Sequence, residues 1–423
     1  MKTLIKNISS LVTVNANGKL YKAGADMQEI GEVRNGAMLF TDKIEWLGTN
    51  AEAEKLIAEG LHIPDKVLDM SSKTILPGFV DSHTHIVFGG NRSNEFARRL
   101  RGATYQEIAA EGGGILTTVK GTRDASIEQL VFSGLQLAKS AIKHGTTALE
   151  IKSGYGLSLD AEIKQLEAIR ILKNELPIHI KSTFLGAHDF PPEYKDRHAG
   201  YVELLCNEMI PEIARRSLAE YCDAFIDKGY YTLEEGEKIL KSGLANGLKL
   251  KVHCDELADF GSSSLAASLG AVSADHLLFI SDAGIEDLIN SGTVAALLPG
   301  TAYFIRMPYA PARKLIDRGA IAALATDCNP GSCFTENMQL ILSLAVINMQ
   351  MTAEEAISAA TLNGARAIGI SDKTGSLEIG KSADFIIADI PSYTDLFYHF
   401  GINHIEQTWV CGEKIFHKED YLE

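Results

Sequence analysis

Two histidines separated by one residue end an apolar stretch near residue 80. In LPGFVDSHTH, His83 and His85 follow a short apolar run, and Asp81 lies two positions before the first of them. Side chains at positions i and i+2 of a strand point to the same face, so both imidazoles can reach one ion. Imidazole nitrogen is a good ligand for zinc, iron and nickel. An HxH pair alone is weak evidence, but at the end of an apolar strand it predicts part of a metal site.

Two further potential ligands lie near the ends of later apolar runs. His253 falls in LKLKVHCDE, and Asp327 ends IAALATD. Each has an ordinary structural explanation, because a buried histidine can bond a backbone carbonyl and an aspartate can cap the next segment. Three histidines and one aspartate, however, provide a mononuclear metal site with room for water, as a catalytic metal requires. Their joint occurrence at strand ends favours that interpretation.

The elements that must position these residues are eight short apolar runs, most of them separated by stretches of helical character such as 159–176 and 354–369. Eight strand–helix units are typical of a (β/α)₈ TIM barrel, although an open doubly wound sheet has the same rhythm. Polar residues occur at the C-terminal end of nearly every run, which is where barrel enzymes build their active sites. The pattern favours a barrel, with strands in 75–85, 146–154, 179–188, 223–229, 248–256, 271–277, 293–300 and 321–327.

The two ends of the chain follow a different pattern. Short apolar stretches separated by Gly and Asn are typical of antiparallel strands, and they recur at both ends. We therefore predict an α/β protein in which a small β-sandwich domain is built from both termini around the barrel. The predicted division is 1–72 and 374–423 for the β domain and 73–373 for the barrel.

Composition limits the class of partner and the compartment. The net charge of −15, from 40 basic and 55 acidic residues, argues against a general affinity for nucleic acid or anionic membranes. None of the six cysteines forms a CxxC pair, which indicates reduced thiols in a cytosol. The opening MKTLIKNISS does not fit a signal peptide, and no run of about 18 apolar residues occurs. We therefore expect a cytoplasmic protein.

Several motifs together resemble a known family. LPGFVDSHTH, His253, His276 and Asp327 look like the metal motif of the amidohydrolase superfamily, and 375–389 resembles the segment where such chains return to their small β domain. A more specific set is similar to the imidazolonepropionases over nearly the whole chain. That set comprises FGGNR (88–92), EGGGI (111–115), EIKSGYGL (150–157), LGAH (185–188), ADHL (274–277) and ATDCNPGS (325–332).

The resemblance implies a metal-dependent hydrolase of histidine degradation. Members of this family open the cyclic C–N bond of 4-imidazolone-5-propanoate and form N-formimidoyl-L-glutamate. The resemblance further implies one Zn²⁺ or Fe²⁺/Fe³⁺ per subunit and a homodimer. The implied metal ligands are His83, His85, His253 and Asp327.

The resemblance also implies roles for other polar residues. Glu256 and His276 are the expected acid–base pair, and Glu256 is the preferred proton donor to the leaving ring nitrogen. Glu256, His276 and Asp327 all remain candidates for the group that takes a proton from water. Arg92 is the expected partner of the substrate carboxylate, because a guanidinium binds a carboxylate in bidentate fashion. The full set expected to bind substrate is Arg92, Tyr155, His188, Glu256, Asn329, Gly331 and Ser332.

Two other functions remain open. A purine or pyrimidine deaminase of the same superfamily, or another cyclic-amide hydrolase, could use the same metal ligands and acid–base residues. A non-catalytic relative would typically have lost some of these residues, and all are present.

Gly112–Gly114 lacks the lysine of a phosphate-binding loop, so a mobile active-site loop is the better interpretation. The remaining histidines, among them His179, are interpreted as ordinary surface or core residues.

Overall fold

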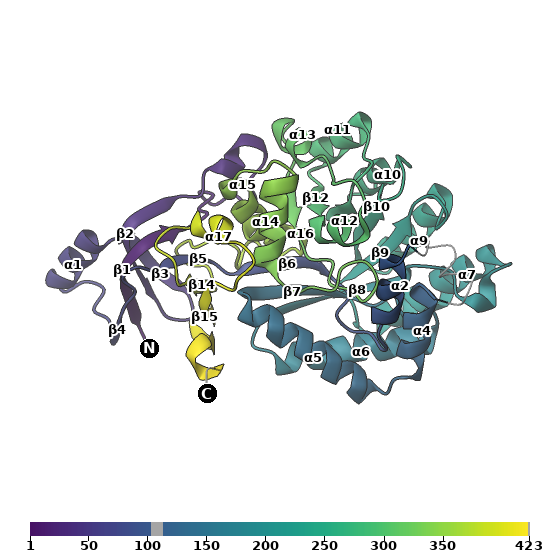
Figure 1. Cartoon of the computed structure of the whole chain (residues 1–423), viewed down its shortest axis with the longest axis horizontal. Helices are drawn as coiled ribbons and strands as arrows, with labels where there is room; N and C mark the ends of the chain where they lie inside the picture. The colour runs from purple at the N-terminus through teal and green to yellow at the C-terminus, as the bar shows by residue number, and fades with distance from the viewer. Residues whose placement is uncertain (103–112, 422–423) are drawn as a thin grey trace.

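The computed structural model describes residues 1–102 and 113–421, so Glu111 and Gly112 of the predicted glycine-rich loop lie outside the described residues. The predicted fold class is confirmed: a parallel sheet of eight strands forms the barrel, and a second sheet contains strands from both termini (Figure 1). The barrel strands are β6 (Phe79–Thr84), β7 (Thr146–Lys152), β8 (His179–Ala187), β9 (Tyr221–Ile226), β10 (Lys249–Cys254), β11 (Ser273–His276), β12 (Val294–Leu297) and β13 (Ala322–Leu324).

Two backbone hydrogen bonds close the barrel between its last and first strands. The amide of Asp327 donates to the carbonyl of His83 over 3.0 Å, and the amide of His85 donates to the carbonyl of Cys328 over 2.9 Å. The chain after β13 therefore continues alongside β6. This pairing brings Asp327 next to the HxH pair, although the residues are far apart in the sequence.

Helices surround the barrel, and several begin with side chains that satisfy free backbone amides. Ser126 with Gln129 and Thr232 with Glu235 form capping boxes at the starts of α5 (Ile127–Lys143) and α9 (Leu233–Ala245). The predicted helix 159–176 is confirmed by α6. The described helices are α1 (Asn50–Ala58), α2 (Ser93–Leu100), α4 (Ile115–Asp124), α5 (Ile127–Lys143), α6 (Leu159–Glu175), α7 (His198–Leu204), α8 (Ile210–Arg215), α9 (Leu233–Ala245), α10 (Ser262–Ser268), α11 (Asp282–Ser291), α12 (Pro299–Ile305), α13 (Ala312–Asp317), α14 (Met338–Asn348), α15 (Ala353–Ala360), α16 (Leu362–Ala367) and α17 (Asp395–Tyr398).

The single helix predicted at 354–369 is in fact two helices, α15 and α16. They meet at Thr361, whose backbone leaves the helical region at φ −124° and ψ −92°. Its hydroxyl donates a 2.6 Å hydrogen bond to the carbonyl of Ile357, which replaces regular backbone pairing at this point. The break lets α16 pack against β6, where a side chain at Gly364 would lie 2.6 Å from the carbonyl of Val80.

The second sheet has the order β16-β15-β14-β5-β1-β2-β3, with β4 paired to β1. The predicted strand run 75–85 supplies one strand to each sheet, because it divides at Gly78 between β5 and β6. A side chain at Gly78 would lie 2.2 Å from the side chain of Thr147, so only glycine fits this turn. The strands of the second sheet are β1 (Thr3–Val12), β2 (Glu32–Phe40), β3 (Ile44–Thr49), β4 (Lys66–Asp69), β5 (Thr74–Pro77), β14 (Phe385–Ala388), β15 (Ile405–Val410) and β16 (Glu413–His417).

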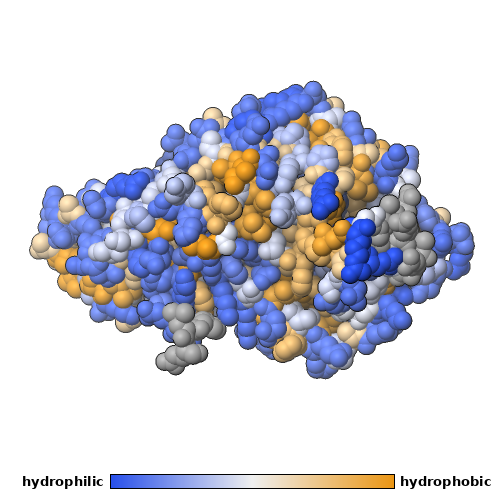
Figure 2. Space-filling model, viewed as in Figure 1, coloured by the Kyte–Doolittle hydropathy of each residue, from blue (hydrophilic) through white to orange (hydrophobic). Residues whose placement is uncertain are grey.

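The hydropathy of the surface and of the helices agrees with the sequence, which is acidic and has no long apolar run. Figure 2 shows a face that is mostly hydrophilic, with hydrophobic residues in separate patches. Among the described residues, no helix has both the length and the apolar character needed to cross a bilayer. The division of the chain into domains after residues 72 and 373 stays a prediction.

Candidate active site

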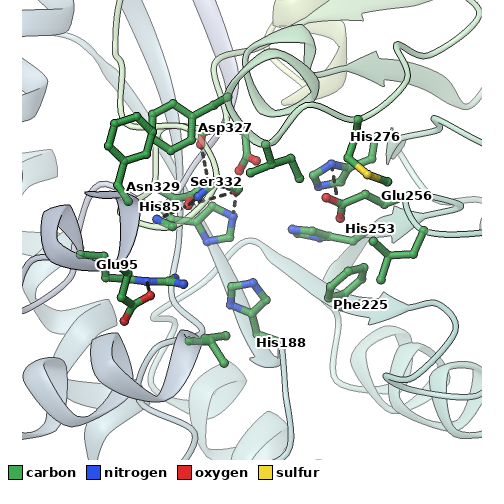
Figure 3. Close-up of a pocket in the computed structure, with 18 of the residues that line it drawn as sticks. His85, Glu95, His188, Phe225, His253, Glu256, His276, Asp327, Asn329 and Ser332 are labelled. Carbon is green, nitrogen blue, oxygen red and sulfur yellow. Dashed lines mark hydrogen bonds and ion pairs between the residues drawn. The ribbon is translucent and has the colours of Figure 1, made fainter. Parts of the chain in front are cut away.

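A cavity of about 610 Å³ opens at the C-terminal ends of the barrel strands. Most of the predicted site residues line it, including His85 after β6, His188 after β8, His253 in β10 and His276 at the end of β11 (Figure 3). His83 is completely buried beneath the lining residues. The structure therefore brings the polar ends of separate runs together at one rim, as expected for a barrel enzyme.

A compact cluster of imidazoles and one carboxylate lies at the base of the cavity. The Nε2 atoms of His83 and His85 are 3.3 Å apart, and each lies within 3.5 Å of Oδ1 of Asp327. The rings of His83 and His253 are separated by 4.6 Å. Among the described residues, three overlapping groups here have ligand atoms close enough for one ion: His83–His253–His276, His85–His188–His253 and His83–His85–Asp327.

The outer nitrogens of two of these histidines are held by buried carboxylates. Nδ1 of His83 lies 2.6 Å from Asp275, and Nδ1 of His253 lies 3.1 Å from Asp223. A carboxylate at Nδ1 fixes the ring and leaves Nε2 with a free electron pair, as in many metal sites. Nε2 of His253 is buried and has no hydrogen-bond partner. Burial also lowers the pKa of His83 and His85, which keeps both rings neutral. The cluster fits a divalent cation.

A buried lysine connects the two orienting carboxylates. The ammonium of Lys152 lies 2.8 Å from Asp223, 2.9 Å from Glu150 and 3.8 Å from Asp275. All four side chains are completely buried. Burial alone would lower the pKa of Lys152, but the surrounding carboxylates outweigh it and raise the pKa, so the ammonium stays charged. This network was not predicted from the sequence, although charged residues within otherwise apolar strands were a signal.

Glu256 lies on the same side of the cavity as His276. Oε2 of Glu256 is 3.5 Å from Nδ1 of His276, and the Glu256 amide donates a 2.7 Å hydrogen bond to Asp227. Burial, with the charges of Asp327 and Asp227, raises the pKa of Glu256 well above its usual range. Glu256 therefore keeps a proton more readily than an ordinary carboxyl group does. His276 has φ of 82°, a strained conformation of the kind found at functional sites.

Asp327 is held in place from outside the cluster. The hydroxyl of Thr301 donates a 2.6 Å hydrogen bond to Oδ2, which leaves Oδ1 facing the histidines. Burial raises the pKa of Asp327 to about 6, against the opposing hydrogen bond from Thr301. Asp327 has φ of 54°, so the chain turns sharply where the carboxylate enters the cavity.

The opposite wall carries positive charge. Arg92 lines the cavity, and its Nε donates a 2.9 Å hydrogen bond to Glu95. Glu95 was not predicted, and it is labelled in Figure 3. Arg99, also not predicted, donates to the carbonyl of Gly331 over 3.1 Å. A side chain at Gly331 would lie 2.2 Å from Nη1 of Arg92, so glycine is needed for the guanidinium to sit there.

The other predicted substrate-binding residues also line the cavity. The side chain of Asn329 accepts hydrogen bonds of 2.8 Å from the amides of both Gly331 and Ser332, which shapes the loop after Asp327. Nδ1 of His188 is 3.0 Å from the carbonyl of Gly154, and burial lowers the pKa of His188 to about 3. Burial raises the pKa of Tyr155, so its phenol stays protonated.

Aromatic residues complete the walls and were not predicted. Phe225 and Tyr230 stack with ring centroids 4.1 Å apart, and Phe96 and Phe304 stack at 4.7 Å. All four line the cavity. Phe225 lies within the predicted strand run 223–229 and the other three lie outside the runs, so the polar strand-end pattern identified none of the four.

Comparisons with known proteins agree with this geometry. Residues 74–415 match the amidohydrolase family. The chain is 46% identical over 419 residues to an imidazolonepropionase from Porphyromonas gingivalis, with 98% of both chains covered. It is 44% identical over 412 residues to one from Geobacillus kaustophilus, with 97% of both covered.

Solved structures of lower identity share the fold. An adenosine deaminase from Xanthomonas campestris with bound zinc superposes with a TM-score of 0.71 at 17% identity, covering 100% of this chain and 94% of that one. A guanine deaminase from E. coli gives 0.71 at 16% identity, with 99% of both chains covered. At such identities the likeness concerns the fold alone. The match to the family and the full-length identity to its members establish that the chain belongs to the amidohydrolase family and, within it, to the imidazolonepropionases.

Proposed function

We propose that this chain hydrolyses 4-imidazolone-5-propanoate to N-formimidoyl-L-glutamate, the ring-opening step of histidine degradation. The observation that carries this proposal is the arrangement of a single cavity. An imidazole–carboxylate cluster and a carboxyl group of raised pKa occupy one side, and Arg92 lines the other. Hydrolysis of a small ring with an anionic tail requires the first set of groups for the chemistry and a cation that binds the tail.

Four residues of the cluster are proposed to hold a metal ion: His83, His85, His253 and Asp327. Their support is the inward Nε2 atoms, the neutral state of the rings and the unpartnered Nε2 of His253. A divalent cation bound there would supply Lewis-acid chemistry, which lowers the pKa of water and polarises a carbonyl. Zn²⁺ and iron both suit this donor set, and metal analysis by mass spectrometry would distinguish them.

Protein groups then move two protons. Water attacks the ring carbonyl carbon, and we assign the proton it loses to the Asp327 carboxylate, which Thr301 keeps in position. Cleavage of the C–N bond leaves a ring nitrogen that needs a proton. Glu256 holds one and donates it, and Nδ1 of His276 lies 3.5 Å from the Glu256 carboxyl as the second member of the acid–base pair.

The rest of the cavity holds the substrate in place. Arg92, fixed by Glu95, is proposed to bind the propionate carboxylate. Tyr155 and His188, with Asn329, Gly331 and Ser332 in the loop after Asp327, are proposed to contact the ring and the tail. In Figure 3 Glu95 lies on the opposite side of the cavity from Glu256 and His276, which separates carboxylate binding from proton transfer.

A turnover assay with freshly prepared 4-imidazolone-5-propanoate tests the proposal. We expect the ring absorbance to disappear, N-formimidoyl-L-glutamate to form without ammonia, and a chelator to stop the reaction. Failure of fully metallated protein to consume the substrate would refute the proposal. Ammonia release from a purine or pyrimidine would instead identify a deaminase, the alternative that uses the same acid–base groups.

Two properties of the assembly complete the proposal. We infer a homodimer, which light scattering after size-exclusion chromatography would measure. We also infer a cytoplasmic location, because all six cysteines are free in the structure. A monomeric mass, or secretion of the protein from its cell, would contradict these inferences.

A further inference from the structure

A second group of potential metal ligands lies away from the cavity. Side-chain atoms of His179, Asp384 and Cys411 lie within 4.8 Å of one another. His179 begins β8, at the end of the barrel opposite the cavity, whereas Asp384 precedes β14 and Cys411 links β15 to β16. The group therefore spans the contact between the barrel and the sheet formed by the termini. It also shows that His179, interpreted from the sequence as an ordinary histidine, has partners of ligand type.

Asp384 is anchored in one orientation. Its Oδ1 accepts hydrogen bonds from the hydroxyl of Ser382 over 2.6 Å and from the amide of Cys411 over 2.7 Å. Its Oδ2 lies 2.9 Å from Nε2 of His179. The carboxylate is completely buried, whereas the His179 side chain is 29% exposed. The buried, oriented carboxylate of Asp384 and the solvent-accessible imidazole of His179 supply two of the ligands that a metal site needs.

The third member is a cysteine in an unusual position. Val410 pairs with Glu413, so Cys411 and Gly412 form a two-residue hairpin loop, and their φ angles are 50° and 72°. Loops with two positive φ angles strongly prefer Asn, Asp or Gly, so cysteine is a strained choice for the first position. The backbone of Gly412 packs directly against that of Thr41, since a side chain at Gly412 would lie 1.7 Å from the carbonyl of Thr41. The second position of the loop therefore requires glycine. Strained backbone conformations of this kind cluster at functional sites, so the Cys411 thiol is a candidate for a functional role.

The thiol is accessible and oriented toward the other two residues. Cys411 is the exposed cysteine of the chain, whereas the other five are buried. Its Sγ lies 3.4 Å from the hydroxyl of Ser382, which also bonds Asp384. An ion can therefore reach the group from solvent.

We propose that His179, Asp384 and Cys411 form a second metal site, suited to Zn²⁺, that ties the barrel to the terminal sheet. Imidazole, carboxylate and thiolate are all zinc ligands, and water would complete a tetrahedral site. The ion takes the place of the proton between His179 and Asp384 and of the thiol proton, and both protons pass to solvent. Because the ligands are far apart in the sequence, the ion closes long loops and stabilises the fold. The site is independent of the proposed catalytic function.

Cobalt titration of the holoenzyme, with its cavity metal already bound, tests the site directly. The ligand set proposed in the cavity contains no thiolate, so a thiolate-to-cobalt charge-transfer band reports on Cys411 alone. We expect the band to saturate at one added equivalent and to disappear in Cys411→Ser. His179→Gln should weaken binding by more than the roughly 10-fold caused by losing an outer-sphere partner. His417→Gln, which changes another histidine of the terminal sheet, should bind cobalt like the unmodified enzyme.

Thermal unfolding provides a second readout. Zn²⁺ at 100 times its dissociation constant should raise the Tm of the holoenzyme by about 3 °C. Cys411→Asn should raise the Tm without added metal, because asparagine suits the turn, and should abolish the response to zinc. The proposal is wrong if no charge-transfer band forms, if the band persists in Cys411→Ser, or if Cys411→Asn responds to zinc like the unmodified enzyme.

Discussion

Replacing Lys152 by methionine is expected to weaken both the fold and the metal site. The ammonium is completely buried and lies within 2.9 Å of Glu150 and Asp223. Methionine fills a similar volume but leaves these carboxylates without their cation. Removing one partner of a buried ion pair typically costs about 3–5 kcal/mol, because the remaining charge stays in a poorly polarisable interior.

The effect on the metal follows from the carboxylates that Lys152 connects. Asp223 and Asp275 hold the outer nitrogens of His253 and His83, so a shift of either carboxylate tilts a ring. Loss of such outer-sphere support typically lowers metal affinity or activity by about 10- to 100-fold. We therefore expect Lys152→Met to reduce metal affinity by a factor in this range.

Denaturant unfolding of the metal-free protein and chelator competition measure the two effects separately. Lys241→Met is the matched control, because Lys241 forms a 2.7 Å ion pair with Glu237 on an exposed helix face, and its loss should cost at most about 0.5 kcal/mol. Adding Glu150→Gln to Lys152→Met should restore part of the stability. If Lys152→Met matches the unmodified protein in both assays, the network does not support the site.

Three further predictions concern proton transfer, substrate binding and pH. Glu256→Gln and His276→Ala should each lower kcat by about 100-fold or more with the metal retained, and an unchanged kcat would remove that residue from the mechanism. Arg92→Ala should mainly raise KM. Gly331→Ala should do the same, because the added methyl group would displace the Arg92 guanidinium, and an unaffected KM in both would contradict carboxylate binding there. Burial alone would raise the pKa of Glu220, but hydrogen bonds from Lys173 and Ser182 outweigh it and lower the pKa to about 2 from its ordinary 4.5. The stability contributed by this carboxylate is therefore present above pH 4.5 and lost as the pH falls toward 2, so the difference in unfolding free energy between Glu220→Gln and the unmodified protein should disappear over that window.

Residue types that local rules place at strand ends were predictable. The HxH pair, His253, His276 and Asp327 each end an apolar run, and the structure places all of them at one end of the barrel. The eight runs themselves were recognised because parallel strands covered by helices are mostly apolar along their length. The break at Thr361 was missed, because it depends on a hydrogen bond and on packing against β6 that the helical pattern does not contain.

The sequence by itself determined the succession of strands and helices and the chemical types at the strand ends, because both follow from short-range periodicity. Only the tertiary structure decided which distant side chains meet. Barrel closure places Asp327 beside His83, Lys152 joins carboxylates from two other strands, and Cys411 reaches His179 across two sheets. Such contacts depend on the path of the whole chain, so a pattern within a few neighbouring residues cannot predict them.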